Sequence, residues 1–389
     1  MKATVLFFFV PESGHAEESL GGVAATARRE GWSLHVLRVE GEAAARAAVS
    51  SWKPDGVLVG GRPSLVLGPD VFAPVPVVYL DHDPDPDAPG SFGKPIFCVP
   101  QDASEAGRIA ARELASLGLA SYAYVPAGNP CHWDRDRFSG FKSELSSVAR
   151  GRPVLKCPFR RTDDAGWHRR LAEWLRSLPR PAGVLAANDR MAWETAASAD
   201  LAGLSIPADM ALVGVDNDLA LCTNMVPDLT SVAPDYRRGG EEAAKLLAEV
   251  MADPSLEPKP RFCRPTEIVR RGSTDRAAAA DPLVARARAL IREKACEGLA
   301  VADVLAVLPG SRRNAERRFR AAAGRSILRE INAVRLDKAR GLLSSGSLGF
   351  AAVAGLCGWS SVAMMRRAFK TATGSLPSDW SAPAARKRG

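Results

Sequence analysis

The sequence predicts an α/β protein of two lobes, each built on a doubly wound parallel sheet, followed by an all-α domain with two helix-turn-helix units. Through about residue 270, short apolar runs alternate with helical stretches, as expected where helices cover both faces of parallel sheets. After Leu283 only short helices are indicated. The charge divides there too: residues 282–389 hold 20 Lys and Arg against 7 Asp and Glu, a net +13, which leaves −5 of the total +8 for residues 1–281.

The first series of units ends near residue 81. Its predicted strands are 4–10, 33–39, 56–61 and 75–81, and its predicted helices are 17–31 and 42–52. Proline and glycine make residues 83–95 a loop. A second series then begins, with helices predicted at 103–118, 136–149, 165–178 and 190–203 and strands at 121–127, 154–159, 183–189 and 210–217. Two series predict two lobes with a cleft between them. We therefore place a large domain at 1–272, a linker at 273–281 and a helical domain at 282–385.

The segment "PGSRRNAERRFR" (309–320) holds five arginines after a proline-glycine turn. Ser311 is a good N-cap, which predicts a helix from about Arg312 to Ala323 that stops at Gly324. Its polar face carries Arg313, Glu316, Arg317 and Arg320, and its inward face carries Ala315, Phe319, Ala322 and Ala323. A short helix, a tight turn and an amphipathic helix with a polar start are typical of a DNA-reading helix-turn-helix. A solvated charged helix is the alternative for this segment alone.

A second copy of the pattern favours the DNA-reading alternative. Residues 350–380 repeat the short apolar helix, with a turn at Gly358 and a predicted cap at Ser360. One face then carries Ala363, Arg366, Arg367 and Lys370, and we expect Met364, Met365 and Phe369 on the opposite face. A helix over 327–343 separates the copies. Two helices on one spacer can enter adjacent major-groove segments, which lie about 34 Å apart.

Three stretches of the helical domain carry a family resemblance: "SRRNAERRFRAAAGRS", "INAVRLDKARGLL" and "AGLCGWSSVAMMRRAFKTATGSLPSDW". They resemble the DNA-binding domain of the AraC/XylS family, although Trp359 stands where that family usually has Phe. The resemblance implies that operator half-sites are contacted through two helices. The residues implied are Arg312, Arg313, Glu316, Arg317 and Arg320 in the first, and Ser361, Val362, Ala363, Arg366, Arg367 and Lys370 in the second. Of these, Arg312, Arg320 and Lys370 suit phosphates. The other arginines, with Glu316, Val362 and Ala363, suit base edges.

The large domain resembles the periplasmic-binding-protein-like sensor of LacI-type regulators, through "VPQDASEAGRIAARELASLG", "WDRDRFSGF", "GVLAANDRMAWE" and "SIPADMALVGVDND". The order of the two domains resembles the xylose-responsive activators of the AraC family. These resemblances imply a clamp for a small sugar. The residues implied are Arg137, Asn188 and Asp216, then Asp189, with Trp133 as a stacking surface and Asp81 at the cleft.

Each of these residues also has a simpler interpretation. Asp216 could be a turn residue, Trp133 a packing residue and Arg137 half of a surface ion pair, and Asp189 could cap the helix that follows it. Residues 11–19 depart from close xylose regulators, so the identity of the ligand stays open.

Other functional classes find little support. The G-x-S-x-G and H-E-x-x-H motifs are absent, and the seven cysteines form no C-x-x-C pair. We therefore expect no enzyme, no metal, no cofactor and no disulfide framework, and we interpret Asp81, His82 and Asp83 as a loop. No apolar run approaches the length of a membrane helix, and the apolar start is a first strand rather than a signal peptide.

The sequence thus predicts a cytoplasmic, homodimeric transcription regulator that binds DNA and a sugar effector, xylose or a related monosaccharide. Activation, and with it contact with RNA polymerase, is implied only by the resemblance. A sugar-binding or sugar-processing protein whose basic tail does not read DNA is the alternative.

Overall fold

The computed structural model divides into two units, residues 1–274 and residues 275–389. The predicted end of the large domain, residue 272, lies beside this division. The structure describes residues 2–10, 16–39, 41–61, 67–80, 82–83, 85, 91–162, 164, 166–265, 267–275, 281–323, 325–344, 348–373 and 376–380. Residues 276–280 of the predicted linker therefore lie outside the described residues.

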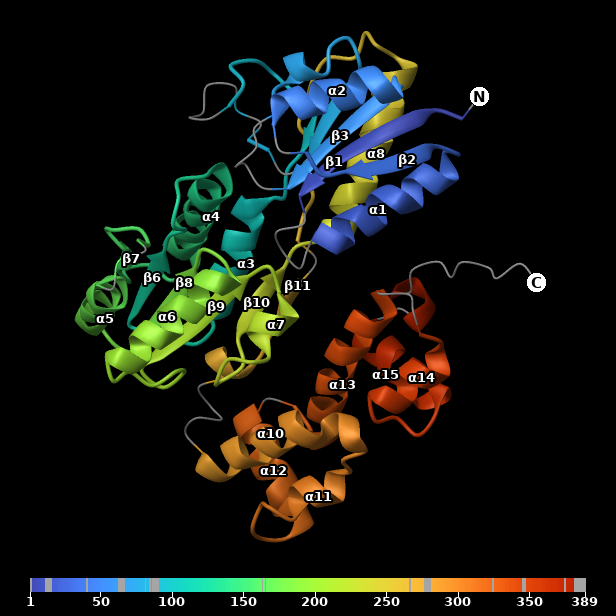
Figure 1. Cartoon of the computed structure of the whole chain (residues 1–389). Coiled ribbons are helices and arrows are strands. Elements are labelled where there is room, and N and C mark those ends of the chain that lie inside the picture. Colours follow the sequence, from blue (N-terminus) through green and yellow to red (C-terminus); the bar gives the residue numbers. More distant parts are fainter. Residues whose placement is uncertain are drawn as a thin grey trace. The chain divides into compact units, whose positions relative to one another are not determined.

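The first lobe of the first unit is built on a parallel five-stranded sheet (Figure 1). Its strands, in order across the sheet, are β2 (Ser33–Leu37), β1 (Thr4–Val10), β3 (Gly56–Gly61), β4 (Val77–Leu80) and β5 (Cys98–Val99). Its helices are α1 (Ala16–Arg29), α2 (Glu42–Trp52) and α8 (Tyr236–Ala252), with a 3-10 turn at Pro69–Val71. The two-residue strand β5 was not predicted, because its few residues are bounded by prolines.

The alternation of β1 explains its continuous apolar sequence. Phe7 and Phe9 pack in a cluster with residues of α1 and α8, whereas Leu6 and Phe8 pack in another cluster with Ala45 of α2. Successive side chains of a strand point to opposite faces of the sheet. Both faces of this sheet are therefore covered, as the sequence predicts for a parallel sheet.

The second lobe holds a six-stranded sheet. Its strands, in order, are β11 (Glu267–Val269), β10 (Thr230–Ala233), β9 (Met210–Val215), β8 (Ala182–Ala186), β6 (Ser121–Val125) and β7 (Val154–Lys156). The β10–β11 pair is antiparallel, and the other neighbours pair in parallel. Its helices are α3 (Ala103–Ala115), α4 (His132–Val148), α5 (Trp167–Ser177), α6 (Asp189–Leu201) and α7 (Leu219–Cys222), with a 3-10 turn at Gly272–Thr274.

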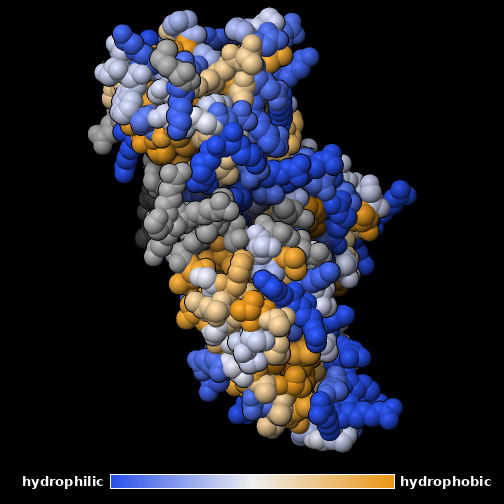
Figure 2. Space-filling model, turned by 90° about the vertical axis from the view of Figure 1, so that its right-hand side faces the viewer, coloured by the Kyte–Doolittle hydropathy of each residue, from blue (hydrophilic) through white to orange (hydrophobic). Residues whose placement is uncertain are grey.

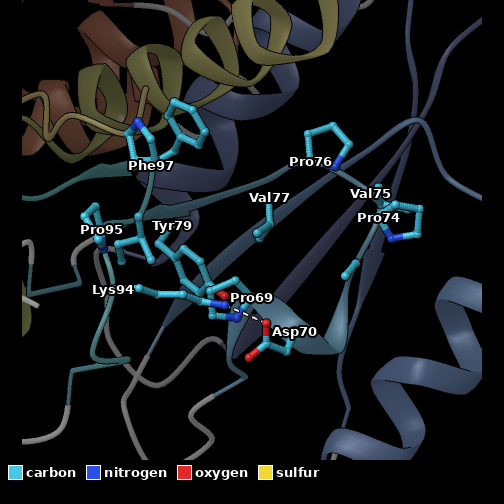
Figure 3. A pocket seen from close by; sticks show the side chains of 13 residues that line it. Pro69, Asp70, Pro74, Val75, Pro76, Val77, Tyr79, Lys94, Pro95 and Phe97 are labelled. Carbon is cyan, nitrogen blue, oxygen red and sulfur yellow. Dashed lines mark hydrogen bonds and ion pairs between the residues drawn. The ribbon is translucent and has the colours of Figure 1, made fainter. Parts of the chain in front are cut away.

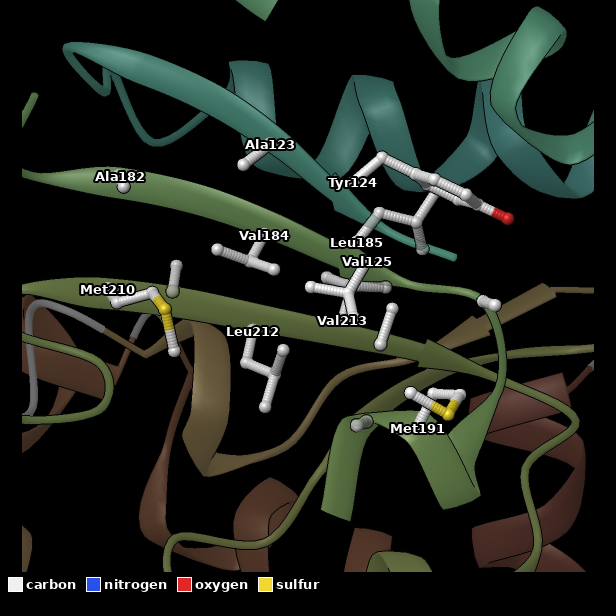
Figure 4. Packing of buried hydrophobic residues seen from close by; sticks show 14 of the residues in the cluster. Ala123, Tyr124, Val125, Ala182, Val184, Leu185, Met191, Met210, Leu212 and Val213 are labelled. Carbon is white, nitrogen blue, oxygen red and sulfur yellow. The ribbon is translucent and has the colours of Figure 1, made fainter. Parts of the chain in front are cut away.

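Branched apolar side chains fill the interior of this second lobe. Figure 4 shows Val184, Leu185, Leu212 and Val213 of the central strands packed among neighbouring side chains, and all four are fully buried. The predicted two-lobed α/β fold is confirmed. All seven cysteines have free thiols.

The second unit consists of helices, as predicted. They are α10 (Pro282–Lys294), α11 (Val301–Leu305), α12 (Arg312–Ala323), α13 (Ile327–Ser344), α14 (Phe350–Leu356) and α15 (Val362–Thr373), with 3-10 turns at Ala295–Glu297 and Pro377–Trp380. One core joins α10, α11 and α12 to the first half of α13, through Ile327 and Ile331. A second core joins α14 and α15 to the second half of α13, through Leu336, Ala339 and Leu343. The long helix α13 therefore belongs to both helix-turn-helix units.

Candidate sugar and DNA sites

The segments that follow the strands of the second lobe carry the predicted ligand residues. Arg137 lies on α4 after β6, Asn188 follows β8, and Asp216 follows β9. These three strands run in parallel in one sheet, β9 beside β8 and β8 beside β6. Their carboxyl ends therefore meet at one edge, which is where open α/β sheets bind ligands.

Arg137 is held inside the lobe at this edge. It is 4% exposed, and its Nη1 donates a hydrogen bond to the backbone oxygen of Ala187, the residue before Asn188. Its Nε is buried and has no hydrogen-bond partner among the described residues. A buried N–H without an acceptor is costly, so this guanidinium is suited to receive an acceptor from a ligand. It is not half of a surface ion pair.

Trp133 lies beside Arg137 because α4 begins earlier than expected. The predicted helix started at residue 136, but α4 starts at His132, so Trp133 and Arg137 are four residues apart on one helical face. The guanidinium carbon of Arg137 lies 5.0 Å from the centre of the Trp133 ring. This cation–π contact covers one face of the indole and holds the guanidinium in place.

Close packing against α3 sets the position of α4. A Cβ on Gly107 of α3 would lie 2.1 Å from the backbone oxygen of Arg137. A Cβ on Gly140 of α4 would lie 2.0 Å from the oxygen of Ser104. These two glycines let the helix backbones touch, so the helix that carries Arg137 has little freedom to shift.

Asn188, rather than Asp189, caps α6. The Asn188 Oδ1 accepts from the backbone N–H of Met191 at 2.9 Å. The cap occupies the carbonyl oxygen of this half-buried side chain and leaves the amide N–H groups as donors for a ligand.

Asp189 points into the lobe. It is 1% exposed, and its oxygens accept from the Ser231 hydroxyl at 2.6 Å and from the Asp218 backbone N–H at 2.8 Å. Burial, and after it the charge of Asp216, raises the pKa of Asp189 to about 7. This arrangement connects the start of α6 to β10 and supports a role in shaping the edge rather than in touching the ligand.

Asp216 ends β9 in an unusual backbone conformation. Its φ is 115°, a value that L-residues rarely adopt. Its Oδ1 accepts from the hydroxyl of Tyr236 at 2.7 Å, and the side chain is half-buried. Residues held in such a conformation cluster at functional sites.

A buried carboxylate that sequence reasoning missed supports the start of α4. Asp134 is fully buried and accepts from the Tyr124 hydroxyl at 2.8 Å, the Ala127 N–H at 2.9 Å and Arg160 Nη1 at 2.9 Å. Arg160 follows β7 and is one-third exposed, so a second guanidinium lies near the same edge. Only the acidic pattern of "WDRD" hinted at Asp134, and nothing local indicated Arg160.

Two other features of the first unit belong to its first lobe. Asp81 lies outside the described residues, while His82 next to it stacks on Phe92 with ring centres 4.5 Å apart. A pocket of about 290 Å³ lies at the amino ends of β4 and β5 (Figure 3). It is lined by prolines, Tyr79 and the Lys94–Asp70 ion pair at 2.5 Å, and by none of the predicted ligand residues. Over the described ranges, no cluster of His, Cys, Asp and Glu could hold a metal ion.

The first basic helix has the predicted bounds and faces. The Asn314 N–H lies 3.4 Å from the Ser311 hydroxyl, and Ala315 and Phe319 are buried. The residues predicted to face DNA are exposed, except half-buried Glu316; they are Arg312, Arg313, Glu316, Arg317 and Arg320. Arg312 pairs with Glu316 at 3.0 Å, and Arg317 donates to Asn314 at 2.9 Å.

The second basic helix departs from prediction in three details. Ser361, not Ser360, stands before α15, with its hydroxyl 3.3 Å from the Met364 N–H. Met364 is 51% exposed, so it does not share the inward face of Met365 and Phe369. Val362 is half-buried against the second core, which limits its reach. The remaining residues predicted to face DNA are exposed: Ser361, Ala363, Arg366, Arg367 and Lys370.

The face of the protein drawn in Figure 2 is mixed in character. Figure 2 shows hydrophilic side chains spread over one face, with hydrophobic patches between them. In the part of the chain that the structure describes, no helix has the length and apolar character to span a bilayer.

Comparisons with known proteins identify two kinds of domain in the chain. A family model of periplasmic binding protein-like domains matches residues 101–274, and a model of helix-turn-helix domains matches residues 304–382. The xylose operon regulatory protein of Escherichia coli (strain K12) is 29% identical over 271 residues, 69% of each chain. Its Haemophilus influenzae counterpart is 27% identical over 267 residues, 67% of this chain and 68% of its own length.

A solved structure of the xylose-binding transcription activator XylR shares the fold. It matches 98% of both chains with a TM-score of 0.58 at 23% identity. These relatives are regulators of transcription and not enzymes. The chain is therefore a transcription regulator homologous to the xylose operon regulatory proteins, with a periplasmic binding protein-like domain followed by an AraC-type helix-turn-helix domain.

Proposed function

We propose that the chain is a sugar-responsive activator that binds a monosaccharide, xylose or a related pentose, at the carboxyl edge of the second sheet. The observation that carries this proposal is the buried Arg137, whose Nε has no hydrogen-bond partner among the described residues. The names of the homologues favour xylose among the sugars. We also propose that the protein is cytoplasmic and forms a homodimer, and that it contacts operator DNA and RNA polymerase.

The side chains at this edge suit a hydroxyl-rich ligand. Arg137 and the Asn188 amide supply donors, Asp216 supplies acceptor oxygens, and a sugar hydroxyl can serve both. Trp133, whose ring lies beside the Arg137 guanidinium, is the proposed stacking surface for an apolar sugar face. Asp189 holds the strand ends behind these groups, and Asp81 is a further proposed contact.

A thermal-shift screen of the full chain against aldoses, ketoses, sugar acids and sugar phosphates tests this proposal. A ligand that binds only the folded state stabilises it by about 2.7 kcal/mol at one hundred times its dissociation constant. We expect xylose or another pentose to raise the melting temperature in a dose-dependent way. No shift with any sugar would contradict the sugar-sensing half of the proposal and leave the DNA-binding half intact.

We further propose that α12 and α15 read DNA with the exposed residues named above. Arg317→Ala and Arg367→Ala should each relax the preference at one base pair by about 1–3 kcal/mol, as measured by selection from a random duplex library. Lys370→Ala should weaken binding to all sequences alike and lower the slope of the salt dependence by about one. The control is Arg329→Ala, an exposed arginine of α13. Equal effects of all four variants on every sequence would refute this division of contacts.

A further inference from the structure

Arg318 is the one arginine of segment 309–320 that has no part in the proposed DNA contacts. Successive residues of a helix are rotated by about 100°, so Arg318 does not share the face of Arg313 and Arg317. Its side chain reaches instead to the start of α10. There its Nε and Nη2 donate to the two carboxylate oxygens of Asp281, at 2.6 and 3.0 Å. Two parallel N–H···O bonds give a geometrically specific ion pair.

Asp281 has a second structural role at the start of α10. It is the N-cap of α10, and its Oδ1 accepts from the backbone N–H groups of Leu283 at 3.1 Å and Val284 at 3.2 Å. The guanidinium of Arg318 lowers the pKa of the Asp281 carboxyl, so this group is charged at neutral pH. One carboxylate thus joins the first turn of α10 to the side of α12.

A second ion pair holds the chain a few residues before Asp281. Asp275, the first residue of the second unit, pairs with Arg288 of α10. Arg288 also donates to Glu330 of α13 at 2.7 Å, and both of these side chains are buried. Asp275 and Asp281, the described residues on either side of 276–280, are therefore both attached to helices of the first helix-turn-helix unit.

We infer that Asp281 and Arg318 are positioning residues for the first DNA-reading helix. Their pair sets the rotation of α12 against α10 and links α12 directly to the chain that arrives from the first unit. The second basic helix, α15, packs in a separate core and does not depend on this pair. The inference rests on the proposed role of α12 in reading DNA.

Asp281→Asn separates the two tasks of Asp281, because Asn is an equally good N-cap but carries no charge for Arg318. Arg318→Met removes the pair from the other side. In hydrogen–deuterium exchange of the full chain, both variants should speed exchange of the α12 amides about two- to fivefold, the range for a half-exposed ion pair. The amides of α15 and of the first turn of α10 should not change. The double variant should add nothing further, since both substitutions break one interaction.

Asp303→Asn is the matched control. Asp303 is an exposed aspartate that accepts from the Ala300 N–H at 2.8 Å at the start of α11, in the same unit. Unchanged α12 exchange in both variants, or additive effects in the double variant, would overturn the inference. Selection from a random duplex library gives the second readout: base preference should relax at the positions read by α12 alone. Faster α12 exchange without that relaxation would support the positioning pair and refute α12 as a reader.

Discussion

Arg137 illustrates how a single side chain can be kept in a costly state. Its guanidinium is almost fully buried, one N–H group has a backbone acceptor, and Nε has none among the described residues. Burial of an unsatisfied donor opposes folding. We propose that a bound ligand supplies the missing acceptor and offsets this cost.

We predict that Arg137→Lys abolishes most of the sugar-induced thermal shift. An ammonium cannot reproduce the planar fork that contacts both Ala187 and a ligand. Loss of charged hydrogen bonds worth about 1.5–3 kcal/mol would weaken sugar binding by about ten- to 150-fold in titration calorimetry. Arg176→Lys is the control, because Arg176 donates to the oxygens of Leu201 and Ala202 in the same lobe. Undiminished affinity in Arg137→Lys would rule out this contact.

The raised pKa of Asp189 predicts a pH dependence of stability. Burial raises this pKa to about 7 from 3.8. Between these two values the folded chain binds more protons at this site than the unfolded chain. Its contribution to the free energy of unfolding therefore decreases as pH rises from about 4 to 7, by at most about 1.4 kcal/mol per pH unit.

Asp189→Asn should remove this slope from melting temperatures measured between pH 5 and 7.5. The exposed Asp200 lies in the same helix, and Asp200→Asn should leave the slope unchanged. An identical slope in the wild-type chain and in Asp189→Asn would mean that Asp189 stays ionised throughout this range.

At the scale of elements, the turn between α14 and α15 requires glycine for two reasons. Gly358 has a φ of 79°, which favours glycine. A Cβ there would also lie 2.6 Å from the backbone oxygen of Ala295, in the first helix-turn-helix unit. Arg335 donates to that same oxygen at 2.8 Å. The turn thus sets both the entry into α15 and the contact between the two helix-turn-helix units.

We predict that Gly358→Ala destabilises the protein by about 1–3 kcal/mol in denaturant unfolding, through backbone strain and this clash. Gly355→Ala is a matched control three residues earlier in α14, where an added Cβ would meet nothing within 4 Å. Alanine is the better helix former there, so the control should be neutral or stabilising by up to about 1 kcal/mol. Equal effects of the two substitutions would show that the turn does not need glycine.

At the scale of the whole molecule, the two parts of the chain carry net charges of opposite sign. The net +13 of residues 282–389 suits a polyanion, while the net −5 of residues 1–281 disfavours contact of that part of the chain with DNA. Regulation then requires that ligand binding in one unit change DNA binding by the other. Such coupling is commonly about 1–3 kcal/mol.

We predict that a sugar identified by thermal shift changes affinity for the selected operator by about five- to 150-fold, and that operator DNA changes sugar affinity by the same factor. Fluorescence anisotropy with labelled DNA and calorimetry with sugar, each with and without the other ligand, measure the two factors. The Arg137→Lys chain should show no effect of sugar on DNA affinity. Unequal factors would mean that DNA binding or sugar binding includes a step, such as dimerisation, outside this coupling.

Local sequence patterns were enough to predict much of the fold of this protein. The alternation of apolar runs predicted eight strands of the two lobes, β1–β4 and β6–β9, because burial on both faces leaves a continuous apolar sequence. It did not predict the short strands β5, β10 and β11. The bounds of α12 followed from Ser311 and from helical periodicity, and the split of charge marked the two units. These signals lie within one element or in composition, so they can be detected without a three-dimensional structure.

Tertiary structure decided what depends on residues far apart in the chain. The Arg318–Asp281 pair joins residues 37 positions apart, and Asp134 meets Arg160 across 26 positions. The early start of α4, which sets Trp133 beside Arg137, follows from packing rather than from a cap, since Cys131 makes no side-chain cap bond. The exposure of Met364 follows from where the second core ends. Local periodicity indicates which residues face inward, but only the folded chain determines which neighbours they meet.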